Sequence, residues 1–119
     1  MGITRWKTLG EKILGKKYNL SIVPADNFLM RKLNKKYRSK DKSTNVLSFP
    51  LDKNTGEIFI NEALAKKEAK EYKLPQKDYL DYLILHSLLH LKGYDHGEEM
   101  LKRERKILKE EFKNIKFEI

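Results

Sequence analysis

Residues Lys77 to Gly93 read KDYLDYLILHSLLHLKG. Apolar side chains between Tyr79 and Leu91 fall on almost every face of a helix, and a helix that is apolar all round belongs in the interior of a domain. Gly93 ends this helix, because glycine readily takes the left-handed conformation at a helix terminus. We therefore expect Lys77–Leu91 to be a central buried helix, with the rest of the chain packed around it.

The flanking sequence predicts four more helices and three strands. We expect helices over Ile3–Leu14, from the capping residue Asp26 to about Lys36, from the capping residue Asn61 through Tyr72, and over Gly97–Phe112; the strands are Tyr18–Val23, Val46–Phe49 and Ile58–Ile60. Turn-forming residues 52–56 favour a hairpin between the last two strands. Together these elements predict one α+β domain over residues 1–119, in which about five helices pack with a short mixed sheet of three to four strands.

Helical spacing also predicts which side chains of two outer helices face the core. In the helix after Asp26 these are Phe28, Leu29, Leu33 and Tyr37. In the last helix they are Met100, Leu101, Ile107, Leu108 and Phe112.

Composition excludes several classes of protein and of site. The chain has 119 residues, 39% of them hydrophobic, which suits one compact domain. Cysteine is absent, so a metal site would have to use imidazole, carboxylate or solvent. We find no apolar run of about 18 residues and no apolar signal-peptide stretch, and therefore expect no membrane span and a cytoplasmic location.

Basic residues outnumber acidic ones by 26 to 17, which gives a net charge of +9. Such an excess suits a polyanionic partner, such as nucleic acid. It also suits the densely ion-paired surface that heat-loving organisms favour. Position favours the first interpretation, because seven basic residues and a single acid, Asp41, lie between Arg31 and Lys42.

All three histidines lie close together, at positions 86, 90 and 96. His86 and His90 are four residues apart, which places both imidazoles on one face of a helix, one turn apart. Gly93 lets the chain turn back, so that His96 could complete the site. The spacing predicts one Zn²⁺ ion held by His86, His90 and His96, with an open position where a bound water has its pKa lowered to about 7.

Two alternatives remain for these histidines. They could be core residues whose nitrogens are satisfied by other partners. They could also hold a purely structural zinc, although such sites usually have four protein ligands. Asp95 is the candidate for a fourth ligand, and could equally be a turn residue or an acceptor for an imidazole N–H.

The sequence HSLLHLKGYDH, from His86 to His96, has the histidine and glycine spacing of the metzincin proteases. Those enzymes need a glutamate directly after the first histidine as general base. Ser87 occupies that position here. The spacing therefore indicates a metal, whereas Ser87 argues against peptide hydrolysis.

The same segment closely resembles the signature of the bacterial YbeY family of rRNA-maturation endoribonucleases. Two upstream segments agree in the right order: YRSKDKSTNVLSFP over Tyr37–Pro50, and GEIFI over Gly56–Ile60. Ser87 stands where the family usually has glycine, and Ser43 replaces a common proline. The resemblance spans about Leu33 to His96.

The resemblance implies a metal-dependent, single-strand-specific endoribonuclease that acts in small-subunit rRNA processing and ribosome quality control. Its partners would be single-stranded RNA, ribosomal RNA above all, and the small ribosomal subunit. It also implies zinc at the three histidines and a functional arginine, which corresponds to Arg38. We take Arg38 and His90 as the catalytic candidates, His90 being also a metal ligand.

The residues themselves support part of this assignment. The guanidinium of Arg38 could hold a phosphate through two parallel hydrogen bonds, although a surface ion pair with Asp41 or Glu57 is the alternative. Four nearby lysines could bind backbone phosphate diffusely or simply form a solvated face: Lys35, Lys36, Lys40 and Lys42. A cleft could be lined by Thr44, Asn45 and Ser48, although Thr44 and Asn45 could equally serve the turn. A zinc hydrolase of another substrate class and an RNA-binding ribosome assembly factor with a structural zinc remain as other functions. The sequence does not indicate an oligomeric state.

Overall fold

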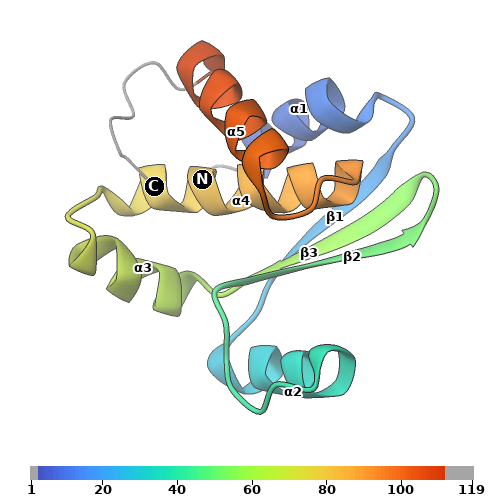
Figure 1. Cartoon of the computed structure of the whole chain (residues 1–119). Coiled ribbons are helices and arrows are strands. Elements are labelled where there is room, and N and C mark those ends of the chain that lie inside the picture. The colour runs from blue at the N-terminus through green and yellow to red at the C-terminus, as the bar shows by residue number, and fades with distance from the viewer. Residues whose placement is uncertain (1–2, 112–119) are drawn as a thin grey trace.

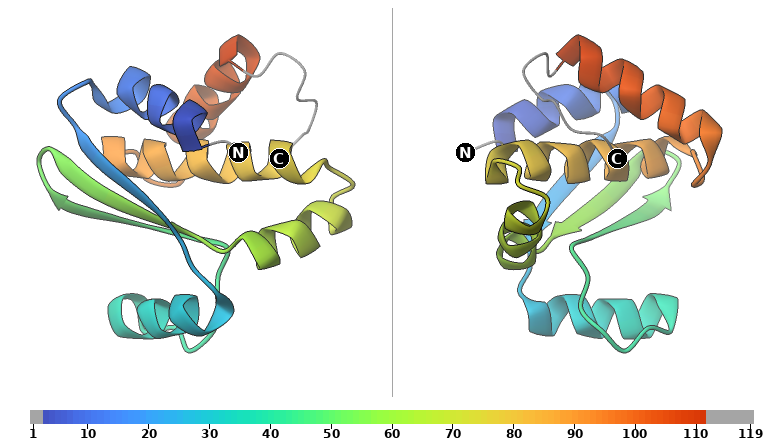
Figure 2. Two further views of the ribbon diagram at one scale, coloured as in Figure 1. Left: turned by 180° about the vertical axis from the view of Figure 1, so that it is seen from behind. Right: turned by 60° about the vertical axis from the view of Figure 1, so that its left-hand side comes forward.

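Helix α4 (Gln76–Lys92) lies at the centre of the fold in the computed structural model, which describes residues 3–111 (Figure 1). Its buried side chains surround the helix as predicted: Tyr79, Leu80, Asp81, Leu83, Ile84, Leu85, Ser87, Leu88 and Leu89. Helices α1 (Ile3–Leu14) and α5 (Glu98–Glu111) pack on one side of α4, and the sheet packs on the other (Figures 1 and 2). The predicted α+β class, with five helices of which one is central and buried, is confirmed.

The sheet has three strands in the order β1-β3-β2 and is mixed, as expected. β1 (Asn19–Pro24) runs parallel to β3 (Thr55–Ile60), whereas β2 (Val46–Asp52) runs antiparallel to it. β2 and β3 are longer than predicted, because the hairpin turns within Lys53 and Asn54 and the residues on either side stay paired. Ile58 and Ile60 of β3 are fully buried in the core that contains α4.

Helix α2 (Asn27–Arg38) lies on the side of the sheet away from α4 (Figures 1 and 2). Asp26 caps it as predicted, accepting a hydrogen bond from the backbone N–H of Leu29 at 2.8 Å.

The predicted inner face of α2 is wrong for three of its four residues, and only Leu33 is partly buried. Phe28 is 72% exposed, Tyr37 58% and Leu29 36%, while Met30 and Asn34 are buried. The side-chain amide of Asn34 donates to the carbonyl oxygen of Lys42 at 3.0 Å. This contact turns the face that carries Met30 and Asn34 inward. The pattern of apolar residues alone therefore does not give the rotation of α2 about its own axis.

Helix α3 (Glu62–Glu71) begins at a fully buried cap, Asn61. Its Oδ1 accepts from the backbone N–H of Leu64 at 3.1 Å. Its Nδ2 lies 2.7 Å from Oδ1 of Asn27 and 3.2 Å from Oγ of Ser43. One side chain thus joins the start of α2, the loop before β2 and the start of α3.

Candidate metal centre

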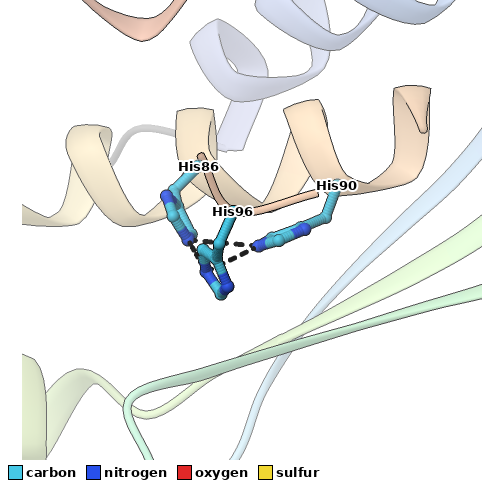
Figure 3. A group of neighbouring side chains, drawn as sticks. All are labelled: His86, His90 and His96. Carbon is cyan, nitrogen blue, oxygen red and sulfur yellow. Dashed lines mark hydrogen bonds between the residues drawn. The ribbon is translucent and has the colours of Figure 1, made fainter. Parts of the chain in front are cut away.

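The three histidines come together at the C-terminal end of α4. His86 and His90 project from consecutive turns of the helix (Figure 3). Gly93 caps the helix with φ of 113°, and its backbone N–H donates to the carbonyl oxygen of His90 at 3.0 Å. The chain then turns back and brings His96 beside the other two (Figure 3), as the sequence predicted from Gly93.

The Nε2 atoms of these residues form a small triangle (Figure 3). Nε2 of His86 lies 3.1 Å from that of His96, and Nε2 of His90 lies 3.2 Å from each of the other two. A tetrahedral zinc ion with Zn–N bonds of about 2.0–2.1 Å keeps its nitrogens about 3.3–3.4 Å apart. The three ring nitrogens therefore already have nearly the spacing that one ion requires.

Hydrogen bonding among the histidines cannot account for this triangle. Each pair would need one donor and one acceptor, and three nitrogens cannot alternate in that way around a triangle. Nδ1 of His90 lies 3.0 Å from the carbonyl oxygen of Tyr94, which can only accept, so Nδ1 carries the proton and Nε2 presents its lone pair inward. The three histidines fit a shared cation, and could hold a metal.

Electrostatics favour the neutral form that a metal binds. Burial lowers the pKa of His90, and the neighbouring charges of His86, His96 and Arg38 lower it further. The hydrogen bond to the backbone of Tyr94 acts in the opposite direction. The net lowering of the pKa favours the neutral imidazole of His90.

His86 is oriented by an acid from another helix. Its Nδ1 lies 2.6 Å from a carboxylate oxygen of Glu104, which is only 5% exposed on α5. A carboxylate that accepts from Nδ1–H fixes the ring orientation and makes Nε2 a better ligand. The sequence pointed to Asp95 for such roles, but Asp95 lines the smaller cavity described below and, among residues 3–111, is not grouped with the histidines as a ligand.

A cleft of about 950 Å³ opens over the three histidines. The three side chains predicted to line a cleft do so: Thr44, Asn45 and Ser48. Arg38, Lys40 and Lys42 join them, whereas Lys35 and Lys36 are not among the lining residues. A smaller cavity of about 530 Å³ also includes Arg38, His90 and His96. The basic end of α2 and the three histidines therefore line one space.

Arg38 is the last residue of α2 and faces this cleft. Its Nη2 lies 3.4 Å from the carbonyl oxygen of Ser48 on β2. The alternative partner, Asp41, instead accepts from Arg31 at 2.8 Å. The guanidinium is thus held at the edge of the cleft by a backbone oxygen and is close enough to His90 to affect its pKa.

Known proteins that resemble this chain are endoribonucleases. The family model for endoribonuclease YbeY matches residues 4–115. The chain belongs to this family. The YbeY endoribonucleases of Wolbachia sp. subsp. Drosophila simulans (strain wRi) and Aquifex aeolicus (strain VF5) are 42% and 38% identical to it over 102 and 107 residues. At the level of the family, the expectation of a metal-dependent endoribonuclease, a hydrolase of RNA phosphodiester bonds, is confirmed.

The alignments also show how much of the YbeY relatives the chain spans. They cover 77% of this chain and 68% of the Wolbachia protein, and 82% of this chain and 71% of the Aquifex protein. For the Ehrlichia ruminantium (strain Gardel) endoribonuclease YbeY, 41% identical, they cover 69% of this chain but only 55% of the relative. A solution structure of a Thermotoga maritima protein superposes with a TM-score of 0.65 at 26% identity, covering 94% of this chain and 85% of that one.

Sequence reasoning missed two features of this YbeY site. The first is Glu104, which stands between Met100 and Ile107 on the buried face of α5. An acidic residue at a core position of an amphipathic helix is the sequence signal that could have identified it. Three tyrosines, Tyr72, Tyr79 and Tyr82, line the end of the cleft beyond the histidines. In the sequence, Tyr79 and Tyr82 are two of the many apolar residues of the central helix, and no spacing rule singles them out.

Proposed function

We propose that the chain is a zinc-dependent endoribonuclease that cleaves single-stranded RNA in the maturation of small-subunit ribosomal RNA and in ribosome quality control. The observation that carries the proposal is the convergence of three inward Nε2 atoms in a cleft that Arg38 also lines. Its substrates are then ribosomal RNA and the small ribosomal subunit. Within residues 3–111, no helix is long and apolar enough to cross a membrane, and we place the activity in the cytoplasm, where ribosomes are assembled.

His86, His90 and His96 would hold the ion, and bound zinc would supply Lewis acidity toward a phosphoryl oxygen or a water. Arg38 would bind the same phosphate and stabilise the charge that develops on it. Lys40 and Lys42, which line the cleft, would attract the neighbouring backbone phosphates. His90 would act in catalysis through the metal that it would hold.

Two observations favour this function over the other candidates. Ser87, at the position of the metzincin general base, is buried and has no carboxylate with which to accept a proton. The metal-ligand cluster has three histidines that open into a large cleft. Three protein ligands leave a coordination position for water or substrate, whereas structural zinc sites are closed by four.

The decisive experiment is RNA cleavage by zinc-loaded protein and by the His90→Ala variant. We expect the native chain to cut an unstructured RNA and to spare the corresponding duplex. Chelation should abolish cleavage, and added zinc should restore it for the native chain only. Equal cleavage by the two proteins would contradict the proposal, and so would digestion of casein in place of RNA.

Product ends identify the attacking oxygen. A 2′,3′-cyclic phosphate means that the RNA 2′-hydroxyl attacks, and its absence from the earliest products means that water does. Precursor and mature small-subunit rRNA, compared as substrates, test the ribosomal assignment. We expect cleavage of the precursor at a defined single-stranded site.

A further inference from the structure

The cleft continues past the histidines to an aromatic surface, which we call the tyrosine wall: Tyr72, Tyr79 and Tyr82. Tyr72 caps the end of α3, and the other two belong to the first turns of α4. The ring centroids of Tyr72 and Tyr79 are 5.6 Å apart, and those of Tyr79 and Tyr82 are 6.4 Å apart. Tyr82 then lies 5.9 Å from the ring of His86, so the aromatic row leads to the metal ligands.

In the tyrosine wall, Tyr79 is held in place by a hydrogen bond, whereas Tyr72 is exposed to solvent. Tyr79 is buried, and its hydroxyl donates to a carboxylate oxygen of Glu68 at 3.0 Å, to which the side-chain amide of Asn45 also donates. Tyr72 is 64% exposed although it lines the cleft. A large exposed aromatic ring beside a fixed neighbour is a surface on which a flat ligand can stack.

The charge of the cleft indicates what kind of flat ligand it takes. Among the described residues that line the larger cavity, four are basic (Arg38, Lys40, Lys42 and Lys73) and none is acidic. Such a lining favours an anion that carries aromatic groups, which is the chemistry of a nucleic acid strand. The basic side chains would attract its phosphates, and its bases could stack on the tyrosine wall.

We propose that the tyrosine wall is a nucleobase subsite, on which an unpaired base of the RNA stacks within one or two nucleotides of the phosphate held at the histidines. This inference rests on the proposed function. The axial rise of α4 from Tyr79 to His86 is about 10 Å, which is short enough for neighbouring nucleotides of one strand to reach both places. A base inside a duplex cannot present its face to the wall, so the subsite selects single strands.

The first test measures RNA binding without cleavage. Fluorescence anisotropy of the full chain in EDTA, with an unstructured RNA, should show affinity reduced about five- to hundredfold by Tyr72→Ala. Tyr72→Phe, which keeps the ring, should bind almost as well as the native chain. Phe28→Ala is the matched control, because Phe28 is at least as exposed as Tyr72 but lies on α2 outside the cleft lining. An equal loss for Tyr72→Ala and Phe28→Ala would overturn the subsite.

The second test asks whether the tyrosine wall acts at one position of the RNA. Abasic residues are placed singly on either side of the mapped cleavage site, and single-turnover cleavage by zinc-loaded protein gives the half-saturating protein concentration and the maximum rate separately. We expect one abasic position to raise the half-saturating concentration for the native chain and to have no further effect for Tyr72→Ala. A uniform effect at all positions, or none, overturns the inference while leaving the proposed function intact.

If the native chain binds RNA but does not cleave it, the proposed function fails and the anisotropy series still decides the subsite. If it binds no RNA, both proposals fall.

Discussion

Nδ1 of His86 lies 2.6 Å from a carboxylate oxygen of Glu104, although the two residues belong to different helices and are 18 positions apart. This contact links the fold to the candidate metal centre, because it fixes the ring whose other nitrogen faces His90 and His96. Helix α5 therefore contributes to the candidate metal centre without supplying one of its three histidines.

The first prediction concerns this pair. Glu104→Gln should lower the zinc affinity about 10- to 100-fold, because the amide accepts more weakly from Nδ1–H and no longer raises the basicity of the ligand. Competition with a chromophoric chelator measures the affinity directly. Glu99→Gln, at an exposed position of the same helix, is the control. Unchanged affinity in Glu104→Gln would show that the contact has no bearing on metal binding.

The second prediction concerns Arg38. Arg38→Ala should reduce the single-turnover cleavage rate about 100-fold, because a charged donor to the phosphate is lost. Its effect on RNA affinity should be smaller, since Lys40 and Lys42 remain in the cleft. Arg31→Ala provides the comparison: Arg31 lies on the same helix and pairs with Asp41 at an exposed site. If both variants lose rate equally, the role of Arg38 is general charge rather than phosphate binding.

The third prediction uses two glycines with left-handed backbones. Gly93 has φ of 113° and Gly15 has φ of 98°, and a Cβ at either would meet no atom within 4 Å. Alanine at either site should cost about 1–2 kcal/mol of unfolding free energy through backbone strain alone. Only Gly93→Ala should also weaken zinc binding, by about tenfold, because relaxing the turn displaces His96. Chemical denaturation and chelator competition on both variants separate the two effects.

The fourth prediction concerns the packing of α1 on α4. Nη2 of Arg5 lies 2.6 Å from both carboxylate oxygens of Asp81, and Nε1 of Trp6 donates to one of them at 2.7 Å. Asp81→Ala leaves the buried indole N–H without this acceptor and should lower the unfolding free energy by about 3 kcal/mol. Asp81→Asn keeps an acceptor and should cost less. Urea unfolding curves decide, and coincident midpoints for native and Asp81→Ala proteins would refute the expectation.

Much of this molecule could be predicted from its sequence. Apolar residues fall on almost every face of residues 77–91, so the central position of α4 follows from the sequence pattern. The histidines converge because a four-residue spacing, a helix-ending glycine and a short return leave few other geometries. The local sequence pattern also predicts the three strands, but it does not predict where they end. Pairing across the hairpin extends β2 and β3 into residues that favour turns.

The features that escaped prediction depend on contacts between distant segments. Phe28 and Tyr37 are exposed because Asn34 binds the carbonyl oxygen of Lys42 and sets the rotation of α2. Glu104 is a site residue because α5 packs where it meets His86. The tyrosine wall exists because the end of α3 lies beside the start of α4. Phe112, also predicted to face the core, lies outside the described residues.

The buried amide of Asn61 has a consequence for motion. It connects the start of α2 and the loop around Ser43 to the first turn of α3. Segments tied by one fully buried side chain open together rather than singly, and their backbone amides should then exchange with solvent at a common rate. The stretch that contributes Lys42, Thr44 and Asn45 to the cleft should therefore open locally at the same rate as the helix that ends at Tyr72. An RNA strand that settles across both ends should slow hydrogen exchange in all three segments at once.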